Sequence, residues 1–215
     1  MNERIAILPG SFDPPTRGHV SLIEEALRQN DVDHVVVVAV HNPTKKKRLL
    51  DVENSLTLLK KMLPADIADR VTLSDSAKSA PRLATEFNAA AVIRGKRDID
   101  PPRKTFIHET AVAAYFTAHR ILHLKKPLQI KWLTSPVQGM SSTRLRQTLF
   151  SDRCSQERLE KFLPADIART LMQAKIKCPD VSKDNSAGFN RVLAEALNPP
   201  PKTNTRRSSP GLKIR

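Results

Sequence analysis

The amino-acid sequence predicts an α/β protein built on a doubly wound, parallel β-sheet. Short apolar runs of strand type alternate along the chain with stretches whose apolar residues have helical spacing. Residues 34–40 are strongly β-branched, which is typical of a strand buried on both faces of a parallel sheet. Polar, basic or glycine-containing loops follow the predicted strands at residues 9–18, 41–50, 94–104 and 134–141. Ligands of such sheets bind beyond the carboxyl ends of the strands, so these loops predict the site.

The first part of the chain alternates strand, helix, strand, helix. Residues 4–8 are an apolar run and predict the first strand. Residues 20–27 place apolar side chains at helical spacing, and residues 34–40 predict the second strand. Asp51 is of the residue type that caps a helix N-terminus, so a second helix is expected from there to Met62.

Shorter elements continue the same alternation. Residues 71–73 and 129–133 predict short strands, and residues 90–93 predict a buried strand that ends at Arg94 and Gly95. Helices are expected at residues 83–87, 105–122, 142–149 and 165–174.

The composition predicts one globular domain with additions at its C-terminal side. The chain has 215 residues, 40% of them hydrophobic, and a formal net charge of +14 at pH 7. We expect a catalytic domain over residues 1–176, a helical extension over residues 177–197 and a basic flexible tail over residues 198–215. The tail has five basic residues and no acid, so it is either solvated or an arm that contacts nucleic acid or a protein partner.

The sequence shows no pattern of a membrane-spanning segment, a signal peptide or a disulfide framework. No apolar run approaches the roughly 20 residues that span a bilayer, and the N-terminus has no signal-peptide layout. Cys154 and Cys178 are too few for a disulfide framework or a metal site. We therefore expect a cytoplasmic protein with free thiols and no membrane partner.

The strongest functional signal is the string GSFDPPTRGH, from Gly10 to His19, directly after the first strand and opening the first helix. Gly10 lets the backbone turn tightly and approach a ligand. Gly18 and His19 lie where a helix N-terminus offers backbone N–H groups to an anion. The His19 side chain can also donate a hydrogen bond to a phosphate on which charge develops.

This string resembles the signature of the HxGH nucleotidyltransferase superfamily, with Thr16 in place of the first histidine. Within that superfamily the chain is most similar to the bacterial phosphopantetheine adenylyltransferases. The resemblance extends over about residues 4–175 and includes four further segments: HNPTKKK at 41–47, VIRGKR at 92–97, SP at 135–136 with MSST at 140–143, and FLP at 162–164. It implies a Rossmann-like nucleotidyltransferase fold. It also implies adenylyl transfer from ATP to 4′-phosphopantetheine, which yields dephospho-CoA and pyrophosphate in coenzyme A biosynthesis.

The resemblance further implies roles for individual residues. The catalytic residues would be His19, Lys45, Arg94 and Ser11. The nucleotide would contact Gly10, Ser11, Phe12, Gly18, His19, Arg94, Gly95, Ser141, Ser142 and Thr143. The acceptor would contact Ser11, Lys45, Ser79, Ala80, Arg94 and Glu109. Mg²⁺ would bridge phosphates and be held mainly by the nucleotide, and the resemblance suggests a hexamer.

Several of these residues also have a structural interpretation. Residues 45–48 form a basic run that is usually a solvated loop, and the position after a buried strand favours a function for Lys45 only. Ser142 or Thr143 can simply cap a helix, which is compatible with phosphate binding. Asp13 is interpreted as a residue that braces a turn or a helix, because an ionised acceptor phosphate needs no base.

The resemblance weakens on the side that would bind the acceptor. Residues 98–109 differ from the family's usual stretch, and Pro101-Pro102 must interrupt any helix there. The helix expected at 110–122 has no Asn, and the family's apolar pair falls on Ser79 and Ala80. Three functions therefore stay open: a divergent phosphopantetheine adenylyltransferase, a related enzyme with another acceptor such as nicotinate mononucleotide, or a non-catalytic paralogue that binds nucleotide or nucleic acid.

Overall fold

The computed structural model describes residues 3–40, 48–76, 78, 80–96, 128–137, 139–182 and 185–199. The helix expected at 105–122 and the basic tail beyond residue 199 lie outside these residues. So do three of the predicted site residues: Lys45, Ser79 and Glu109.

Within the described residues, five parallel strands form one sheet, which confirms the predicted fold class. The strands are β1 (Ile5–Gly10), β2 (His34–Val40), β3 (Val71–Ser76), β4 (Ala91–Gly95) and β5 (Gln129–Leu133). Their order is β3-β2-β1-β4-β5, so the chain extends the sheet in one direction from β1 and then in the other. Ile7 of β1 pairs with Val36 of β2 on one side and with Val92 of β4 on the other. The switch point, where ligands of such sheets bind, therefore lies at the carboxyl ends of β1 and β4.

The helices agree with the pattern expected from the sequence where both can be compared. They are α1 (Arg17–Arg28), α2 (Val52–Met62), α3 (Ala80–Glu86), α5 (Ser142–Phe150), α6 (Gln156–Glu160), α7 (Ala165–Lys177) and α8 (Ala187–Leu197), with a 3₁₀ turn at Ala68–Arg70. Asp51 caps α2 as predicted, because its side chain accepts a hydrogen bond from the Asn54 N–H. The sequence did not reveal α6, whose single buried residue, Leu159, is too little to show a helical period. No helix in the described part of the chain is long and apolar enough to cross a membrane.

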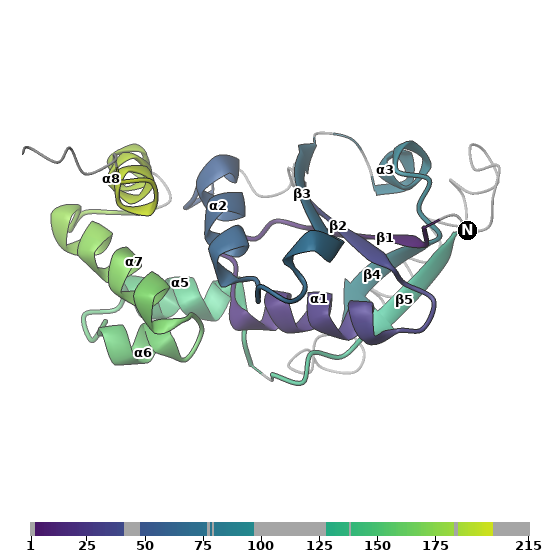
Figure 1. The fold of residues 1–215 in the computed structure, drawn as a ribbon. Coiled ribbons are helices and arrows are strands. Elements are labelled where there is room, and N and C mark those ends of the chain that lie inside the picture. Colours follow the sequence, from purple (N-terminus) through teal and green to yellow (C-terminus); the bar gives the residue numbers. More distant parts are fainter. Residues whose placement is uncertain are drawn as a thin grey trace, which may run out of the picture.

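The middle residues of β1 and β2 are buried on both faces because helices cover both sides of the sheet (Figure 1). Ala6 and Leu8 of β1 point into the larger core cluster, which also contains Leu58 and Leu59 of α2 and Ile23 of α1. The alternate residues of β1, β2 and β4 point to the opposite face of the sheet, where they pack with α3 in a second cluster. Its buried members are Ile7, Val36, Val38, Leu83, Ala84 and Val92. Side chains of a strand alternate between faces, so this division explains why residues 35–40 are apolar throughout.

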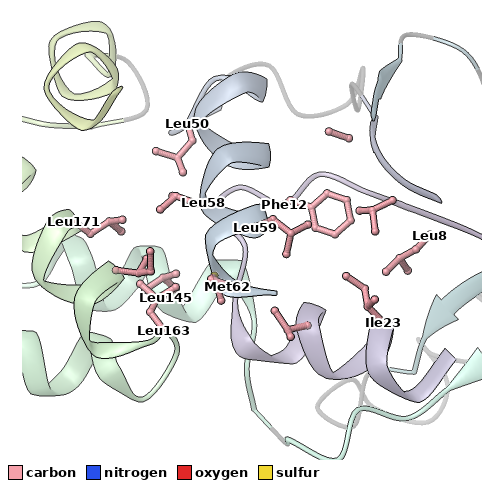
Figure 2. Packing of buried hydrophobic residues seen from close by; sticks show 14 of the residues in the cluster. Leu8, Phe12, Ile23, Leu50, Leu58, Leu59, Met62, Leu145, Leu163 and Leu171 are labelled. Carbon is pink, nitrogen blue, oxygen red and sulfur yellow. The ribbon is translucent and has the colours of Figure 1, made fainter. Parts of the chain in front are cut away.

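The C-terminal helices share the larger core rather than forming one of their own. Leu145 of α5, Leu163 and Leu171 belong to the same buried cluster as α2, and Figure 2 shows them facing the α2 side chains Leu58 and Met62. Helix α8 packs on α7 and on α2. Its buried apolar residues are Phe189, Leu193 and Leu197.

Candidate active site

The loop between β1 and α1 is a tightly packed turn. Phe12 is buried, with a φ of 44°. Its ring lies so close to Gly10 that a Cβ at Gly10 would meet the ring at 2.8 Å. A side chain at position 10 would therefore displace Phe12, which explains the glycine. The loop also contains a cis peptide bond between Asp13 and Pro14.

His19 lies in the first turn of α1 and is held by the residue that caps the helix. The Thr16 N–H donates to His19 Nδ1 over 3.0 Å, so the imidazole occupies the place that Glu or Gln has in a capping box. Because Nδ1 accepts, the proton of the neutral ring is on Nε2. The Phe12 ring packs edge-on against the imidazole, with 5.1 Å between the ring centroids.

Burial lowers the pKa of His19 to about 4, because it disfavours the charged imidazolium. The side chain is therefore neutral at pH 7 and offers a hydrogen-bond donor at Nε2. The backbone N–H of His19 donates to the Thr16 carbonyl oxygen at 2.9 Å. This N–H, which the sequence predicted as a donor to an anion, is therefore already bonded within the helix turn. Nε2–H is thus the donor of His19 that can serve a ligand.

This pKa makes the stability of the protein pH-dependent. The ordinary pKa of 6.5 applies to the unfolded chain, which binds a proton more readily than the folded state. The free energy of unfolding should therefore be unaffected by His19 above pH 6.5 and should fall as the pH drops from 6.5 towards 4, by roughly 3 kcal/mol at about 1.4 kcal/mol per pKa unit. Urea denaturation of the wild type and of His19→Gln across this range measures the effect. Equal slopes for the two proteins would contradict it.

The N-terminus of α5 closes over the loop from the other side. A Cβ at Gly18 would lie 2.9 Å from the Met140 carbonyl oxygen, so the glycine allows α1 and this turn to approach. The Ser142 hydroxyl donates to the Pro14 carbonyl oxygen at 2.8 Å, and Ser141 caps α5 by accepting from the Arg144 N–H. The structure thus brings the two glycine- and serine-rich segments of the predicted nucleotide site together, although 122 positions separate Ser141 from His19 in the chain.

Asp13 braces this loop, as the sequence interpretation expected. Its buried carboxylate accepts from the Leu49 N–H at 3.0 Å and from the Leu50 N–H at 2.8 Å. Arg146 of α5, which is also buried, pairs with the same carboxylate at 3.7 Å and donates to the Asp13 carbonyl oxygen. A buried carboxylate with these partners is a structural anion rather than a catalytic base.

Arg48 corrects the interpretation of residues 45–48 as a solvated basic run, for this one residue of the run. The described member of the run, Arg48, is half-buried, and its guanidinium donates to the carbonyl oxygens of Ser11 (2.7 Å) and Leu50 (2.9 Å) and to the Ser55 hydroxyl (3.0 Å). Burial lowers the pKa of its guanidinium, and the charge of Asp13 opposes that shift. Arg48 therefore ties the loop after β1 to the start of α2.

The carboxyl end of β4 carries two further predicted residues, Arg94 and Gly95. Arg94 is partly buried and pairs with Trp132 of β5, and Gly95 packs on α1, where an added Cβ would meet a Leu22 methyl carbon at 2.8 Å. Ala80 is the first residue of α3. The described residues of the predicted nucleotide site therefore lie around the carboxyl ends of β1 and β4.

Two arginines of this region were not predicted as site residues. Arg146 stands in the predicted helix beside the apolar Leu145, and a charge next to a buried stripe is the signal that could have indicated its pairing. Arg48 carried no comparable signal. The local sequence of a basic run is the same whether one of its arginines is half-buried or fully solvated.

The described residues contain no group of three or more His, Cys, Asp or Glu side chains placed to hold a metal ion. Asp13, the acid of the GSFDPPTRGH loop, is occupied by Leu49, Leu50 and Arg146. These residues do not form a protein cage for a divalent cation.

The chain matches a known protein family and several named relatives. The cytidylyltransferase-like family matches residues 7–148. The chain is similar to the phosphopantetheine adenylyltransferase of Leifsonia xyli subsp. xyli, with 40% identity over 95 residues, 44% of this chain and 58% of that protein. It is also similar to the phosphopantetheine adenylyltransferase of Lactobacillus gasseri, with 39% identity over 93 residues, 43% of this chain and 54% of that protein. The matched part thus spans little more than half the length of these relatives.

The fold resembles that of solved adenylyltransferases. Plasmodium falciparum nicotinic acid mononucleotide adenylyltransferase complexed with NaAD superposes with a TM-score of 0.57 at 15% identity, over 85% of this chain and 98% of that one. The same enzyme complexed with APC gives a TM-score of 0.55 at 15% identity, with the same coverage of both chains. At this identity the likeness concerns the fold, while the family match covers most of the chain, from β1 to α5. The chain belongs to the cytidylyltransferase-like family.

Proposed function

We propose that this protein is a nucleotidyltransferase that moves the adenylyl group of ATP onto the phosphate of a small molecule, with 4′-phosphopantetheine as the first candidate acceptor. The observation that supports it best is His19, a neutral imidazole whose Nδ1 is occupied and whose Nε2–H is left as a donor at the carboxyl end of the sheet. The names of the similar relatives support the acceptor. The products would be dephospho-CoA and pyrophosphate.

In the proposed reaction an oxygen of the acceptor phosphate forms a bond to the α-phosphorus of ATP. The bond from that phosphorus to the α,β-bridging oxygen breaks, and pyrophosphate leaves with the electron pair. Such a transfer needs alignment and charge stabilisation more than covalent help. His19 would donate Nε2–H to the phosphate oxygens as their charge increases, and a neutral donor needs no proton transfer to do so.

The other predicted residues would orient the two substrates. Arg94 would hold the β- and γ-phosphates, since a guanidinium suits bidentate contact. Ser11 would donate to the phosphates where the substrates meet, and Lys45 would bind the attacking phosphate. The triphosphate would lie against the α5 N-terminus at residues 141–143, where helix N–H groups favour an anion.

Magnesium would enter with the nucleotide. The residues described around the loop after β1 supply no carboxylate cage, so we propose that the phosphates of ATP supply most of its ligands. The ion would neutralise the phosphate charge during transfer.

The cellular form of the enzyme is also a proposal. We expect a cytoplasmic homo-oligomer, a hexamer by resemblance, in which residues 1–176 form the transferase domain. The tail from residue 198 onward would be solvated, with nucleic-acid contact as the alternative. Light scattering of the 215-residue protein and of a variant that ends at residue 197 tests the oligomer.

A second acceptor, nicotinate mononucleotide, is favoured by a specific observation. The solved structures with this fold include a nicotinic acid mononucleotide adenylyltransferase, and the segments of this chain that would bind pantetheine depart from the family pattern at Ser79, Ala80 and residues 98–109. The chemistry at the α-phosphorus would be the same. Only the group behind the attacking phosphate would differ.

The acceptor assay separates these functions. The purified protein is incubated with Mg-ATP and, separately, with 4′-phosphopantetheine or nicotinate mononucleotide, and pyrophosphate release is followed. We expect release with 4′-phosphopantetheine well above the ATP-only background. Release with the mononucleotide alone would reassign the acceptor. Silence with both, together with measurable ATP binding, would contradict the proposed transfer to either and favour a protein that only binds nucleotide.

A further inference from the structure

Helix α8 lies beyond residue 148, where the family match ends, yet one of its side chains reaches the neighbourhood of the site. Asn190 Nδ2 donates to the Leu49 carbonyl oxygen at 2.9 Å, and Asn190 Oδ1 accepts from the Asp51 N–H at 3.0 Å. The backbone carbonyl of Asn190 also accepts from Asn54 Nδ2 at 2.9 Å. A carbonyl can only accept and an N–H can only donate, so the amide orientation is determined.

The segment held by Asn190 is held from its other side by Asp13. The N–H groups of Leu49 and Leu50 donate to Asp13, while the Leu49 carbonyl and the Asp51 N–H bond to Asn190. Leu49 and Leu50 have no exposed surface, so these backbone groups need partners within the protein. We call residues 49–51 with Asp13 and Asn190 the α2 clamp.

Arg48 connects the clamp to Ser11, one of the proposed reacting groups. Arg48 precedes the clamp, accepts a hydrogen bond from the Ser186 hydroxyl at its carbonyl (3.4 Å), and donates from its guanidinium to the Ser11 carbonyl oxygen. Asp13 belongs to the same loop as Ser11. Residues 41–47, which include Lys45, join the chain immediately before Arg48.

We propose that Asn190 is a positioning residue of the active site. By completing the hydrogen bonds of residues 49–51, it fixes the segment that directly follows Arg48, the arginine that holds Ser11. This inference rests on the proposed function. Apolar contacts of Phe189, Leu193 and Leu197 already dock α8, so the amide of Asn190 serves the clamp rather than the docking.

The test compares Asn190→Ala with Val32→Ala. Val32 is buried in the connection between α1 and β2, at the opposite end of the sheet from the site, so its truncation also lowers the melting temperature without touching the clamp. For Asn190→Ala we expect kcat/KM for the acceptor to fall about tenfold or more while the Kd of ATP changes less than about threefold. For Val32→Ala both constants should stay within about twofold of the wild type.

Either of two kinetic outcomes overturns the proposal. One is wild-type kinetics in a folded Asn190→Ala protein, and the other is an equal loss of kcat/KM in Val32→Ala. If Asn190→Ala does not fold, Asn190→Gln replaces it, because glutamine keeps the amide but shifts it by one methylene. Its kcat/KM for the acceptor is expected to fall by less than the loss expected for Asn190→Ala.

Amide hydrogen exchange separates this proposal from the proposed function. The N–H groups of Leu49, Leu50 and Asp51 should exchange about tenfold faster or more in Asn190→Ala than in the wild type and should be unchanged in Val32→Ala. If the wild type transfers no adenylyl group to either acceptor but this difference is present, the proposed function fails and the clamp stands. Unchanged exchange overturns the clamp, whatever the activity.

Discussion

Replacing His19 with alanine is expected to lower kcat for adenylyl transfer by about 10³-fold, with a much smaller change in KM. The reason is the neutral state of the ring: Nδ1 accepts from Thr16, and burial holds the pKa near 4, so Nε2–H is a fixed donor at pH 7. A donor aimed at charge that develops only in the transition state affects kcat more than binding. Steady-state pyrophosphate release measures it.

His19→Gln is the matched control for the helix cap. Glutamine in the first turn can accept from the Thr16 N–H as in a capping box, so α1 should begin at the same residue while the imidazole donor is lost. We expect His19→Gln to be nearly as impaired as His19→Ala but more stable. Circular dichroism confirms that both variants are folded. Near-normal turnover in folded His19→Ala would refute the role of His19.

Replacing Asp13 with alanine is expected to lower the free energy of unfolding by about 3–5 kcal/mol, the range for breaking a buried ion pair from one side. Arg146 would keep a buried charge without its carboxylate, and the N–H groups of Leu49 and Leu50 would lose their acceptor. Chemical denaturation at pH 7 measures the change. A loss below about 1 kcal/mol would show that the site relaxes around the missing carboxylate.

Two controls identify the cause of that loss. Asp33→Ala removes a carboxylate whose pKa is lowered by hydrogen bonds from Arg4, but this pair is exposed, so the effect on stability should be far smaller. The double variant Asp13→Ala/Arg146→Met removes both charges of the buried pair. It should recover part of the stability lost in Asp13→Ala, because the uncompensated guanidinium is gone.

Local features of the sequence predicted most of the fold. The cap at Asp51 and the β-branched run of residues 34–40 agree with α2 and β2 as observed. These features are encoded within a few residues: a side chain that caps its own helix, or apolar residues that repeat with the period of a strand. The sequence predicted that Gly10 lets the backbone turn tightly and approach a ligand, whereas the structure requires a glycine there because of the Phe12 ring.

Contacts between distant segments were not predictable in this way. Arg48 gave no sign that it would be buried, and the bonds of Asn190 to Leu49 and Asp51 join positions about 140 residues apart. Nothing in the residues around Asn190 indicates that its side chain would bond to the Leu49 carbonyl oxygen and the Asp51 N–H. Such pairs depend on where α8 docks, which depends in turn on apolar packing summed over α2 and α7.

By itself, the sequence therefore determined the order of strands and helices, the fold class and the GSFDPPTRGH loop, because periodicity and capping act over short distances along the chain. The tertiary structure alone decided the protonation state of His19, the pairing of Asp13 with Arg146 and the clamp around residues 49–51. Burial and hydrogen-bond partners come from segments far apart in the sequence, and only the packed chain brings them within bonding distance.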